Sequence, residues 1–230
     1  MAQSDTYVLV SGAFCGGWTW REIADRLTAL GHRVLAPSLT GLADRSHLLS
    51  PAINLSTHVT DIANLIKWEE LSNIVLVGAS YGGAVITGVA EKVAPDAIKS
   101  VVYIDAMYLE DGKSCADTFP EAFAALPADD ALGVPDLFAD APNDPAVKRF
   151  FRLITPHPTG TFVERLKLTG AVERIPIKTY VFATKNTMAP IFGGIAAKMK
   201  ANPSWRYIEV PSDHMIPARE TIEILLAAAN

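Results

Sequence analysis

Short runs of apolar, mostly β-branched residues recur along the chain, and between them apolar residues return every three or four positions. A short apolar run predicts a strand. Several of these runs contain no polar position, as is typical of parallel strands that are buried on both faces. Six strands are predicted in this way, at residues 7–10, 33–35, 74–77, 101–104, 179–182 and 207–210.

Helical spacing separates most of these strands. One apolar stripe predicts a helix from Trp20 to Leu30, and a second predicts a helix with Ser56 as its N-cap residue. A third helix is expected to begin just after Ser80, and the last is expected to carry Pro217 in its first turn. Strands that alternate with helices predict an α/β fold with a doubly wound, mostly parallel six-stranded sheet.

The alternation stops in residues 108–175, where no strand is evident and prolines are frequent. A loop of this length without structure is uncommon in a compact domain, so we expect short helices here, such as one over residues 146–153. The segment is therefore predicted to form a helical cap, inserted into a core made of residues 1–107 and 176–230.

Composition and charge restrict the classes of function. The chain has 230 residues, which suits one α/β domain, and its net charge of −5 comes without a basic patch, so nucleic acid and membrane surfaces are not expected as partners. Cys15 and Cys115 form neither a disulfide framework nor a zinc pattern, and no dinucleotide, phosphate-loop or metal motif occurs. No cofactor or metal is therefore expected. The first residues lack the features of a signal peptide, which predicts a cytoplasmic protein, and the oligomeric state is left open.

Residues 78–82 read G-A-S-Y-G and lie between a predicted strand and a predicted helix. They fit G-x-S-x-G, the nucleophile elbow that holds a serine in a strained, exposed position above a sheet. The other interpretation is an ordinary turn in which Ser80 caps the helix. A serine nucleophile also needs a base, an acid and an oxyanion hole, so the rest of the sequence decides between the two.

His214 is the predicted base. In folds that carry this turn, the histidine comes after the serine and the acid in chain order, in the loop that follows the last strand. His214 lies in that loop, whereas His32, His47, His58 and His157 lie elsewhere, and His58 is expected to be solvated at the start of a helix.

Two backbone N–H groups are predicted to form the oxyanion hole. One belongs to Tyr81, the residue after the serine, and the other to Ala13 in the glycine-rich loop that follows the first strand. The alternative is that this loop only turns the chain. Four residues adjoin the catalytic loops in sequence and are predicted to bind an apolar or aromatic part of the substrate: Phe14, Met107, Tyr108 and Met215.

Three stretches together resemble the α/β-hydrolase superfamily: residues 8–20 (V-L-V-S-G-A-F-C-G-G-W-T-W), 78–83 (G-A-S-Y-G-G) and 213–214 (D-H). They are most similar to the branch that contains plant hydroxynitrile lyases and methyl-ester esterases. Residues 40–51 (T-G-L-A-D-R-S-H-L-L-S-P) further resemble a bacterial subgroup of that branch. The resemblance implies the α/β-hydrolase fold and a cofactor-free enzyme with a cap over the serine.

Two residues depart from the pattern of this branch. Its first loop usually reads H-G-A, but Ser11 stands at the first of these positions, which changes the hydrogen bonds available to support the oxyanion loop. Hydroxynitrile lyases carry a lysine after the catalytic histidine, and this chain has Met215 there, so cyanohydrin cleavage is not favoured.

The resemblance leaves two sites for the acid of the triad. Hydrolases of this fold most often place the acid after the strand at 179–182, where this chain has only the neutral Asn186. The other site is the end of the preceding strand, which holds Asp105. Asp213 adjoins His214, but neighbours in an extended segment point apart. We therefore predict Asp105 as the acid, with capping of a helix or a loop at the strand end as its alternative role.

Together these residues predict a serine hydrolase that cleaves a carboxylic ester, a lactone or a thioester of a small molecule through an acyl-enzyme. A carbon–carbon lyase of the hydroxynitrile-lyase type and a non-catalytic receptor for a small ligand remain alternatives, because one fold hosts many functions. No residue pattern in the sequence singles out one substrate.

Overall fold

The central sheet has six parallel strands in the order β2-β1-β3-β4-β7-β8. The computed structural model describes residues 4–94, 96–120, 123–124, 131–133, 145–186 and 189–229. All predicted strands are present, with bounds that differ by a few residues: β1 (Thr6–Val10), β2 (Arg33–Leu35), β3 (Ile74–Ala79), β4 (Ile98–Ile104), β7 (Ile177–Ala183) and β8 (Arg206–Val210). The doubly wound α/β fold is therefore confirmed.

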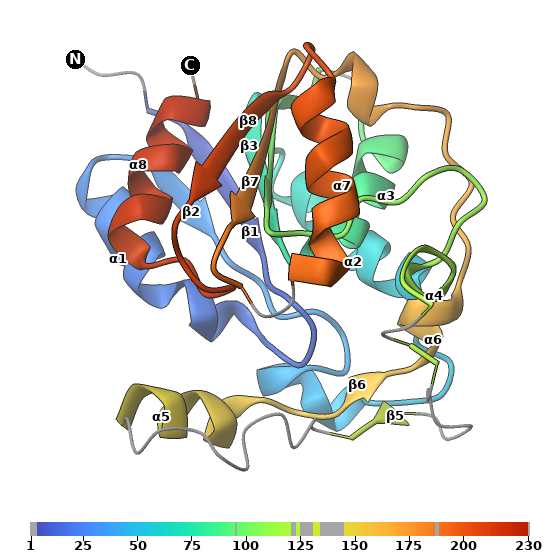
Figure 1. Ribbon diagram of the computed structural model, residues 1–230. Coiled ribbons are helices and arrows are strands. Elements are labelled where there is room, and N and C mark those ends of the chain that lie inside the picture. The colour runs from blue at the N-terminus through green and yellow to red at the C-terminus, as the bar shows by residue number, and fades with distance from the viewer. Residues whose placement is uncertain are drawn as a thin grey trace.

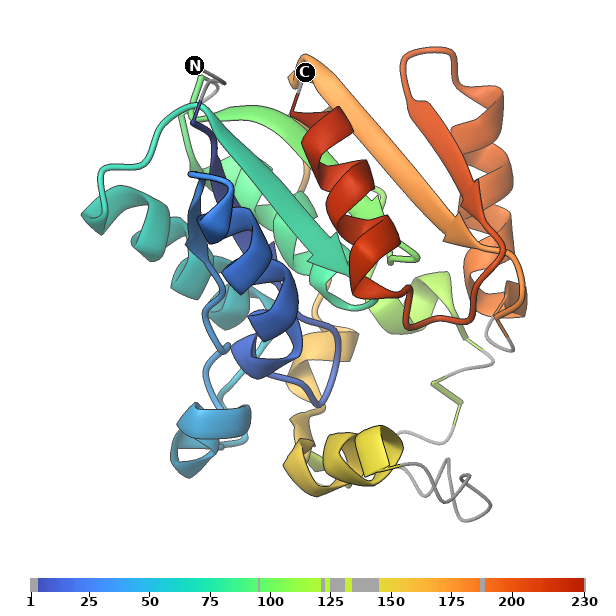
Figure 2. The same cartoon turned by 90° about the vertical axis from the view of Figure 1, so that its left-hand side faces the viewer.

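Helices cover both faces of the sheet (Figures 1 and 2). On one face lie α1 (Arg21–Ala29) and α8 (Ala218–Ala228), which Figure 2 shows in front of the strands. On the other face lie α2 (Leu55–Trp68), α3 (Gly82–Lys92) and α7 (Ala189–Ala201). In the part of the chain that the structure describes, no helix combines the length and the apolar character needed to cross a bilayer.

The strands supply a hydrophobic core on each face, because successive side chains of a strand point in opposite directions. Tyr7 and Leu9 of β1 pack in the core beneath α1 and α8, and Val8 and Val10 pack in the core beneath α2 and α3. This double burial is the reason that the strands are apolar at nearly every position, as a parallel sheet covered on both faces requires.

Two helix starts differ from the expectation. Asn54, and not Ser56, is the N-cap of α2: its side chain accepts a hydrogen bond from Thr57 N at 3.0 Å, and its own amide donates to Thr57 Oγ1 at 3.3 Å. This reciprocal capping box satisfies two amides that the helix leaves without partners. Pro217 lies at the N-cap of α8, one residue before the helix begins.

Residues 108–175, called the cap segment below, contain short elements: α4 (Cys115–Thr118), β5 (Ala131–Leu132), α5 (Pro145–Leu153), β6 (His157–Pro158), α6 (Gly160–Val163) and a 3₁₀ turn, η3 (Val172–Arg174). The helix expected near residues 146–153 is present as α5. The expectation of no strand is wrong, because β5 and β6 form an antiparallel pair that joins Leu132 to His157. Both strands and α5 lie beyond the carboxyl ends of the central strands (Figures 1 and 2). The division into core and cap stays a prediction.

Candidate active site

Ser80 occupies a strained turn between β3 and α3. Its φ of +52° lies in the left-handed region, which costs a residue with a side chain about 1–3 kcal/mol. The turn is held on both sides, because Ser80 N donates to Ile104 O at 3.2 Å and Met107 N donates to Ser80 O at 2.9 Å. Gly82 allows the close packing behind the serine, since a Cβ there would lie 2.5 Å from the carbonyl oxygen of Val10. This is the geometry expected of a nucleophile elbow.

Asp105 lies at the end of the neighbouring strand, level with the serine. The pairing of β3 with β4 sets Ala79 opposite Ile104, so Ser80 and Asp105 are the next residues on adjacent strands. Asp105 also has a left-handed φ, of +44°, and its side chain is fully buried. The amide of Ala183 donates to its Oδ1 atom at 3.2 Å. Two strained residues side by side at the carboxyl edge of the sheet indicate a functional site.

His214 follows β8 and meets this aspartate. Its Nδ1 atom lies 2.6 Å from Asp105 Oδ2, and its ring stacks on Phe192 of α7 with centroids 5.3 Å apart and planes 6° apart. The contact with the carboxylate places a proton on Nδ1, which leaves Nε2 as the nitrogen that can accept one. Among the described residues, no hydrogen bond joins Ser80 Oγ to this ring, and catalytic hydrogen bonds of this kind often tighten only in the substrate complex.

Asn186 lies beside the same pair, at the position where related folds most often keep the acid. Its Nδ2 atom donates to Asp105 Oδ2 and lies 3.2 Å from His214 Nδ1. Because both nitrogens carry protons when His214 donates to the carboxylate, the hydrogen bond of Asn186 belongs to Asp105. The structure thus brings both candidate positions to one imidazole, with the aspartate in the closer contact.

The loop between β1 and α1 passes next to the serine. A Cβ on Gly12 would lie 3.1 Å from Ser80 Cβ, so the following residue, Ala13, is close to the nucleophile. Ser11 supports the loop from inside, because its hydroxyl donates to Gly16 O at 2.8 Å. Among the hydrogen bonds recorded for the described residues, the amides of Ala13 and Tyr81 donate none, as two oxyanion-hole donors should.

Two buried histidines lie behind this loop, and sequence reasoning missed both. The expectation that His58 is solvated is wrong: it is fully buried, with Nδ1 2.8 Å from the Tyr81 hydroxyl and Nε2 2.8 Å from Thr40 O. Burial lowers the pKa of His58 to about 4. His157 is also fully buried, and burial, followed by the nearby His58, lowers its pKa well below the ordinary range. Helical spacing could have revealed His58, since it shares the apolar stripe of Leu55.

Three of the four predicted substrate contacts adjoin the candidate catalytic residues. Phe14 is partly buried, Met107 is 6% exposed and hydrogen-bonds through its amide to Ser80, and Met215 beside His214 is 62% exposed. Phe192, which the sequence did not single out, covers one face of the His214 ring. Phe14 and Met215 are therefore the predicted contacts with side-chain surface exposed beside the candidate site, whereas Met107 and Phe192 are buried.

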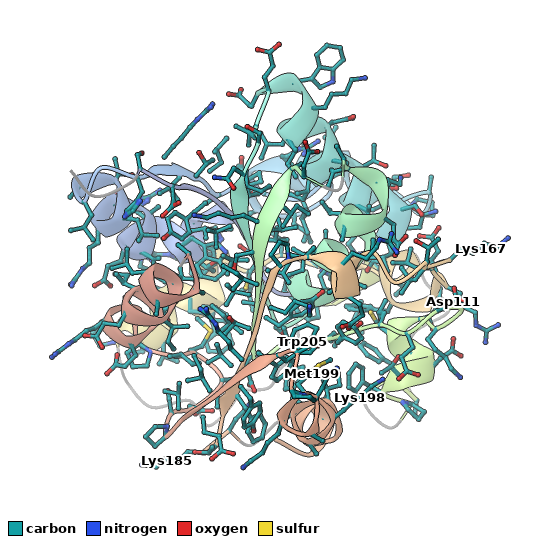
Figure 3. The ribbon with its side chains drawn as sticks, turned by 90° about the horizontal axis from the view of Figure 1, so that it is seen from above. Asp111, Lys167, Lys185, Lys198, Met199 and Trp205 are labelled. Atoms are coloured by element: carbon teal, nitrogen blue, oxygen red, sulfur yellow. The ribbon has the colours of Figure 1, made fainter. Side chains whose placement is uncertain are left out.

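Tyr108 belongs to a different cluster. Its ring packs against Tyr103 and Trp205, and its hydroxyl donates to Glu173 at 3.0 Å. It lines a cavity of about 320 Å³ together with Met199 and Lys198. Figure 3 labels these two residues, which belong to the last turn of α7. In the described part of the chain it has no recorded contact with Ser80, Asp105 or His214. We therefore leave it out of the candidate site, because adjacency to Met107 in sequence does not place it there.

Other reactive groups are poorly placed for chemistry. Within the described ranges, no three histidine, cysteine, aspartate or glutamate side chains converge as the ligands of a metal ion would. Cys15 and Cys115 are buried free thiols, and burial raises the pKa of each to about 12. A thiol with such a pKa is a poor nucleophile near neutral pH. Ser80 is therefore a better candidate nucleophile than either cysteine.

The parallel sheet, the strained serine after β3 and the histidine after β8 define an α/β-hydrolase. Residues 7–223 match the alpha/beta hydrolase family, and the chain belongs to that family. The resemblance drawn from the motifs is therefore confirmed.

Relatives of known description narrow the class. The chain is 36% identical over 223 residues to a carbendazim hydrolyzing esterase of Nocardioides sp. (strain SG-4G), a match that covers 90% of this chain and 91% of that protein. It is 32% identical over 130 residues to methylesterase 2 of Arabidopsis thaliana, over 52% of this chain and 45% of the relative. The expectation of an ester-cleaving hydrolase is confirmed by these relatives.

A solved structure gives the same result for the fold. An extracellular alpha/beta-hydrolase from a Paenibacillus species, described as sharing structural and functional homology with tobacco salicylic acid binding protein 2, superposes with a TM-score of 0.81. It is 26% identical, and the match covers 97% of this chain and 98% of the other. The likeness therefore extends through the cap segment as well as the sheet.

Proposed function

We propose that this ester-cleaving hydrolase is a serine esterase in which Ser80, His214 and Asp105 form the catalytic triad and the amides of Ala13 and Tyr81 form the oxyanion hole. The contact of 2.6 Å between the buried carboxylate of Asp105 and His214 Nδ1 carries the proposal. This contact favours the tautomer with the proton on Nδ1, in which Nε2 can act as the base. Phe192 stacks on the same ring and supports its orientation.

Acylation follows from these positions. Ser80 Oγ attacks the carbonyl carbon of the ester while its proton passes to His214 Nε2, and the carbonyl oxygen becomes an oxyanion that accepts hydrogen bonds from Ala13 N and Tyr81 N. The bond from the carbonyl carbon to the alcohol oxygen then breaks, and the imidazolium returns its proton to the departing alkoxide. The alcohol leaves, and the acyl group stays on the serine.

Deacylation repeats the sequence with water. His214 takes a proton from water as its oxygen attacks the acyl carbon, and the proton then returns to Ser80 Oγ as the carboxylic acid is released. Asp105 stabilises the imidazolium in both halves and keeps its own charge. No atom outside the chain, the ester and water is needed to balance these steps.

The substrate we propose is a small ester with an apolar or aromatic group. Phe192 stacks on the His214 ring, Phe14 and Met215 adjoin Ala13 and His214 in the chain, and the Nocardioides relative is named for a small-molecule substrate. The Nocardioides relative is named for the hydrolysis of carbendazim, so carbendazim should be tested as a substrate together with aromatic and aliphatic methyl esters. Higher kcat/KM for an aromatic methyl ester than for a long-chain aliphatic one would support this preference, and the reverse order would contradict it.

The test of the triad is covalent labelling of the serine. The purified protein should release a burst of p-nitrophenol from p-nitrophenyl acetate and should gain the mass of one fluorophosphonate adduct, located on Ser80 by peptide mapping. Ser80→Ala should fold, lose both signals and lose nearly all turnover. An adduct on another residue, or a Ser80→Ala variant with half of the original rate, would exclude the proposed nucleophile.

A further inference from the structure

His157 of the cap segment contacts the oxyanion loop directly. Its Nδ1 atom accepts a hydrogen bond from the backbone N–H of Phe14 at 3.1 Å, and its Nε2 atom lies 2.8 Å from Thr161 Oγ1. Thr161 Oγ1 itself donates to Pro158 O at 2.7 Å, so it accepts from the ring. These contacts assign a neutral imidazole with its proton on Nε2, the tautomer in which Nδ1 is an acceptor.

The cap segment also binds the backbone carbonyl group of Phe14. Thr155 N donates to Phe14 O at 3.0 Å, so both backbone groups of Phe14 are engaged by residues 155–157. Phe14 needs this support, because its φ of +65° lies in the left-handed region. With the Phe14 amide turned to His157, the amide available to a substrate oxygen is that of Ala13.

The ring of His157 also packs on the residue that provides the second oxyanion donor. Its centroid lies 4.8 Å from that of Tyr81 in an edge-to-face contact, and 4.5 Å from that of Phe162 in a stacked contact. The Tyr81 hydroxyl is held in turn by His58. One buried imidazole therefore touches the backbone beside Ala13 and the side chain of Tyr81.

We propose, on the basis of the esterase function above, that His157 is a positioning residue for the oxyanion hole. Its Nδ1 atom fixes the orientation of the Phe14 amide, and this contact orients the neighbouring Ala13 N–H towards the oxyanion. The residue does not touch the substrate. Because it belongs to β6, the placement of the cap segment and the geometry of the oxyanion hole are set together.

Two substitutions distinguish the role of the Nδ1 acceptor from that of the other contacts of the His157 ring. In His157→Asn the amide oxygen takes the place of Nδ1 and still accepts from Phe14, whereas in His157→Gln the amide reaches the place of Nε2 and the acceptor is lost. We expect His157→Gln to lower kcat for p-nitrophenyl acetate about 10- to 100-fold with little change in KM, because a displaced donor weakens only the transition state. His157→Asn should recover most of that loss.

A trifluoromethyl ketone provides a readout that a merely structural role would not move. Ser80 adds to its carbonyl and forms a tetrahedral oxyanion, so its affinity should fall in His157→Gln in parallel with kcat/KM. Thr169→Val is the matched control, because Thr169 also joins the cap segment to the core, through Glu91 at 2.7 Å, without any recorded contact to Phe14 among the described residues. It should keep the kcat of the unaltered protein.

The outcomes separate this proposal from the esterase itself. An unaltered protein without ester hydrolysis or Ser80 labelling would refute both. An active protein whose His157→Gln variant keeps its kcat, or whose Asn and Gln variants are equally slow, would refute the positioning role alone. If His157→Gln does not fold, the hydrogen bond is tested in the unaltered protein by NMR. A scalar coupling between Phe14 N and His157 Nδ1 across the hydrogen bond would support the proposal, and the absence of this coupling would overturn it.

Discussion

Exchanging the aspartate and the asparagine beside His214 tests the assignment of the acid. Three N–H donors converge on the Asp105 carboxylate, from His214, Ala183 and Asn186. An asparagine at position 105 has only one acceptor oxygen, and its amide group must face one of these donors. Asp105→Asn should therefore favour the wrong tautomer of His214. The same exchange in a serine-protease triad lowers the rate by about 10⁴, which corresponds to about 5 kcal/mol, and we expect a loss of that order here.

Asn186 offers a way to restore the charge. Its Nδ2 atom lies 3.2 Å from His214 Nδ1, so an aspartate oxygen in its place would reach the imidazole. We expect the double variant Asp105→Asn, Asn186→Asp to regain about 100-fold of the lost rate, because a carboxylate again accepts from Nδ1. Asn186→Ala alone should cost at most about tenfold, since it removes one hydrogen bond to the acid and leaves the charge.

The assay is kcat/KM for p-nitrophenyl acetate near neutral pH, measured on the two single variants and the double variant, with thermal unfolding of each to confirm that it is folded. Rates within tenfold of the unaltered protein for Asp105→Asn would refute Asp105 as the acid. A double variant no faster than Asp105→Asn would refute the claim that the two positions address the same nitrogen.

Two further predictions concern the scaffold of the site. Gly82→Ala places a Cβ 2.5 Å from the backbone oxygen of Val10, so it should destabilise the protein by about 3 kcal/mol, measured by urea unfolding; a loss below about 1 kcal/mol would contradict the tight elbow. Burial lowers the pKa of His58 from 6.5 to about 4, so the unfolded chain takes up its proton first as the pH falls. The contribution of His58 to stability should therefore be lost between about pH 6.5 and about pH 4, by about 3 kcal/mol at about 1.4 kcal/mol per pKa unit, and His58→Gln should lose correspondingly less stability than the unaltered protein over this range.

The strands, and the positions where Ser80, Asp105 and His214 lie, were predictable because both follow from local patterns and topology. A sheet buried on both faces makes β3 apolar throughout, and parallel strands end at one edge, where Ser80 and Asp105 meet. The loop after β8 returns to that edge with His214. These inferences need only the order of the elements and the identity of the residue that follows each strand.

The contacts that support the site were not predictable, because they join segments that are distant in the sequence. His58 and His157 are buried because Tyr81, Thr40, Phe14 and Thr161 provide their partners, and these partners come from four separate segments. The apolar stripe of α2 marks the buried face on which His58 lies, but no local pattern encodes the tertiary partners that a buried polar side chain needs. The strands β5 and β6 have two residues each, too few to show an alternation.

The sheet also explains why the sequence offered two positions for the acid. Ile104 of β4 pairs with Val181 of β7, so Asp105 and the loop that carries Asn186 emerge side by side and face the same imidazole. Two aspartates there would place like charges in contact, which disfavours the ionised pair, and two asparagines would leave the imidazolium without a counter-charge. One aspartate and one asparagine supply a single charge with a donor beside it. Asn186 therefore suits a site in which Asp105, on the neighbouring strand, carries the charge. The loss caused by a change at one of these positions should be compensated by the matching change at the other.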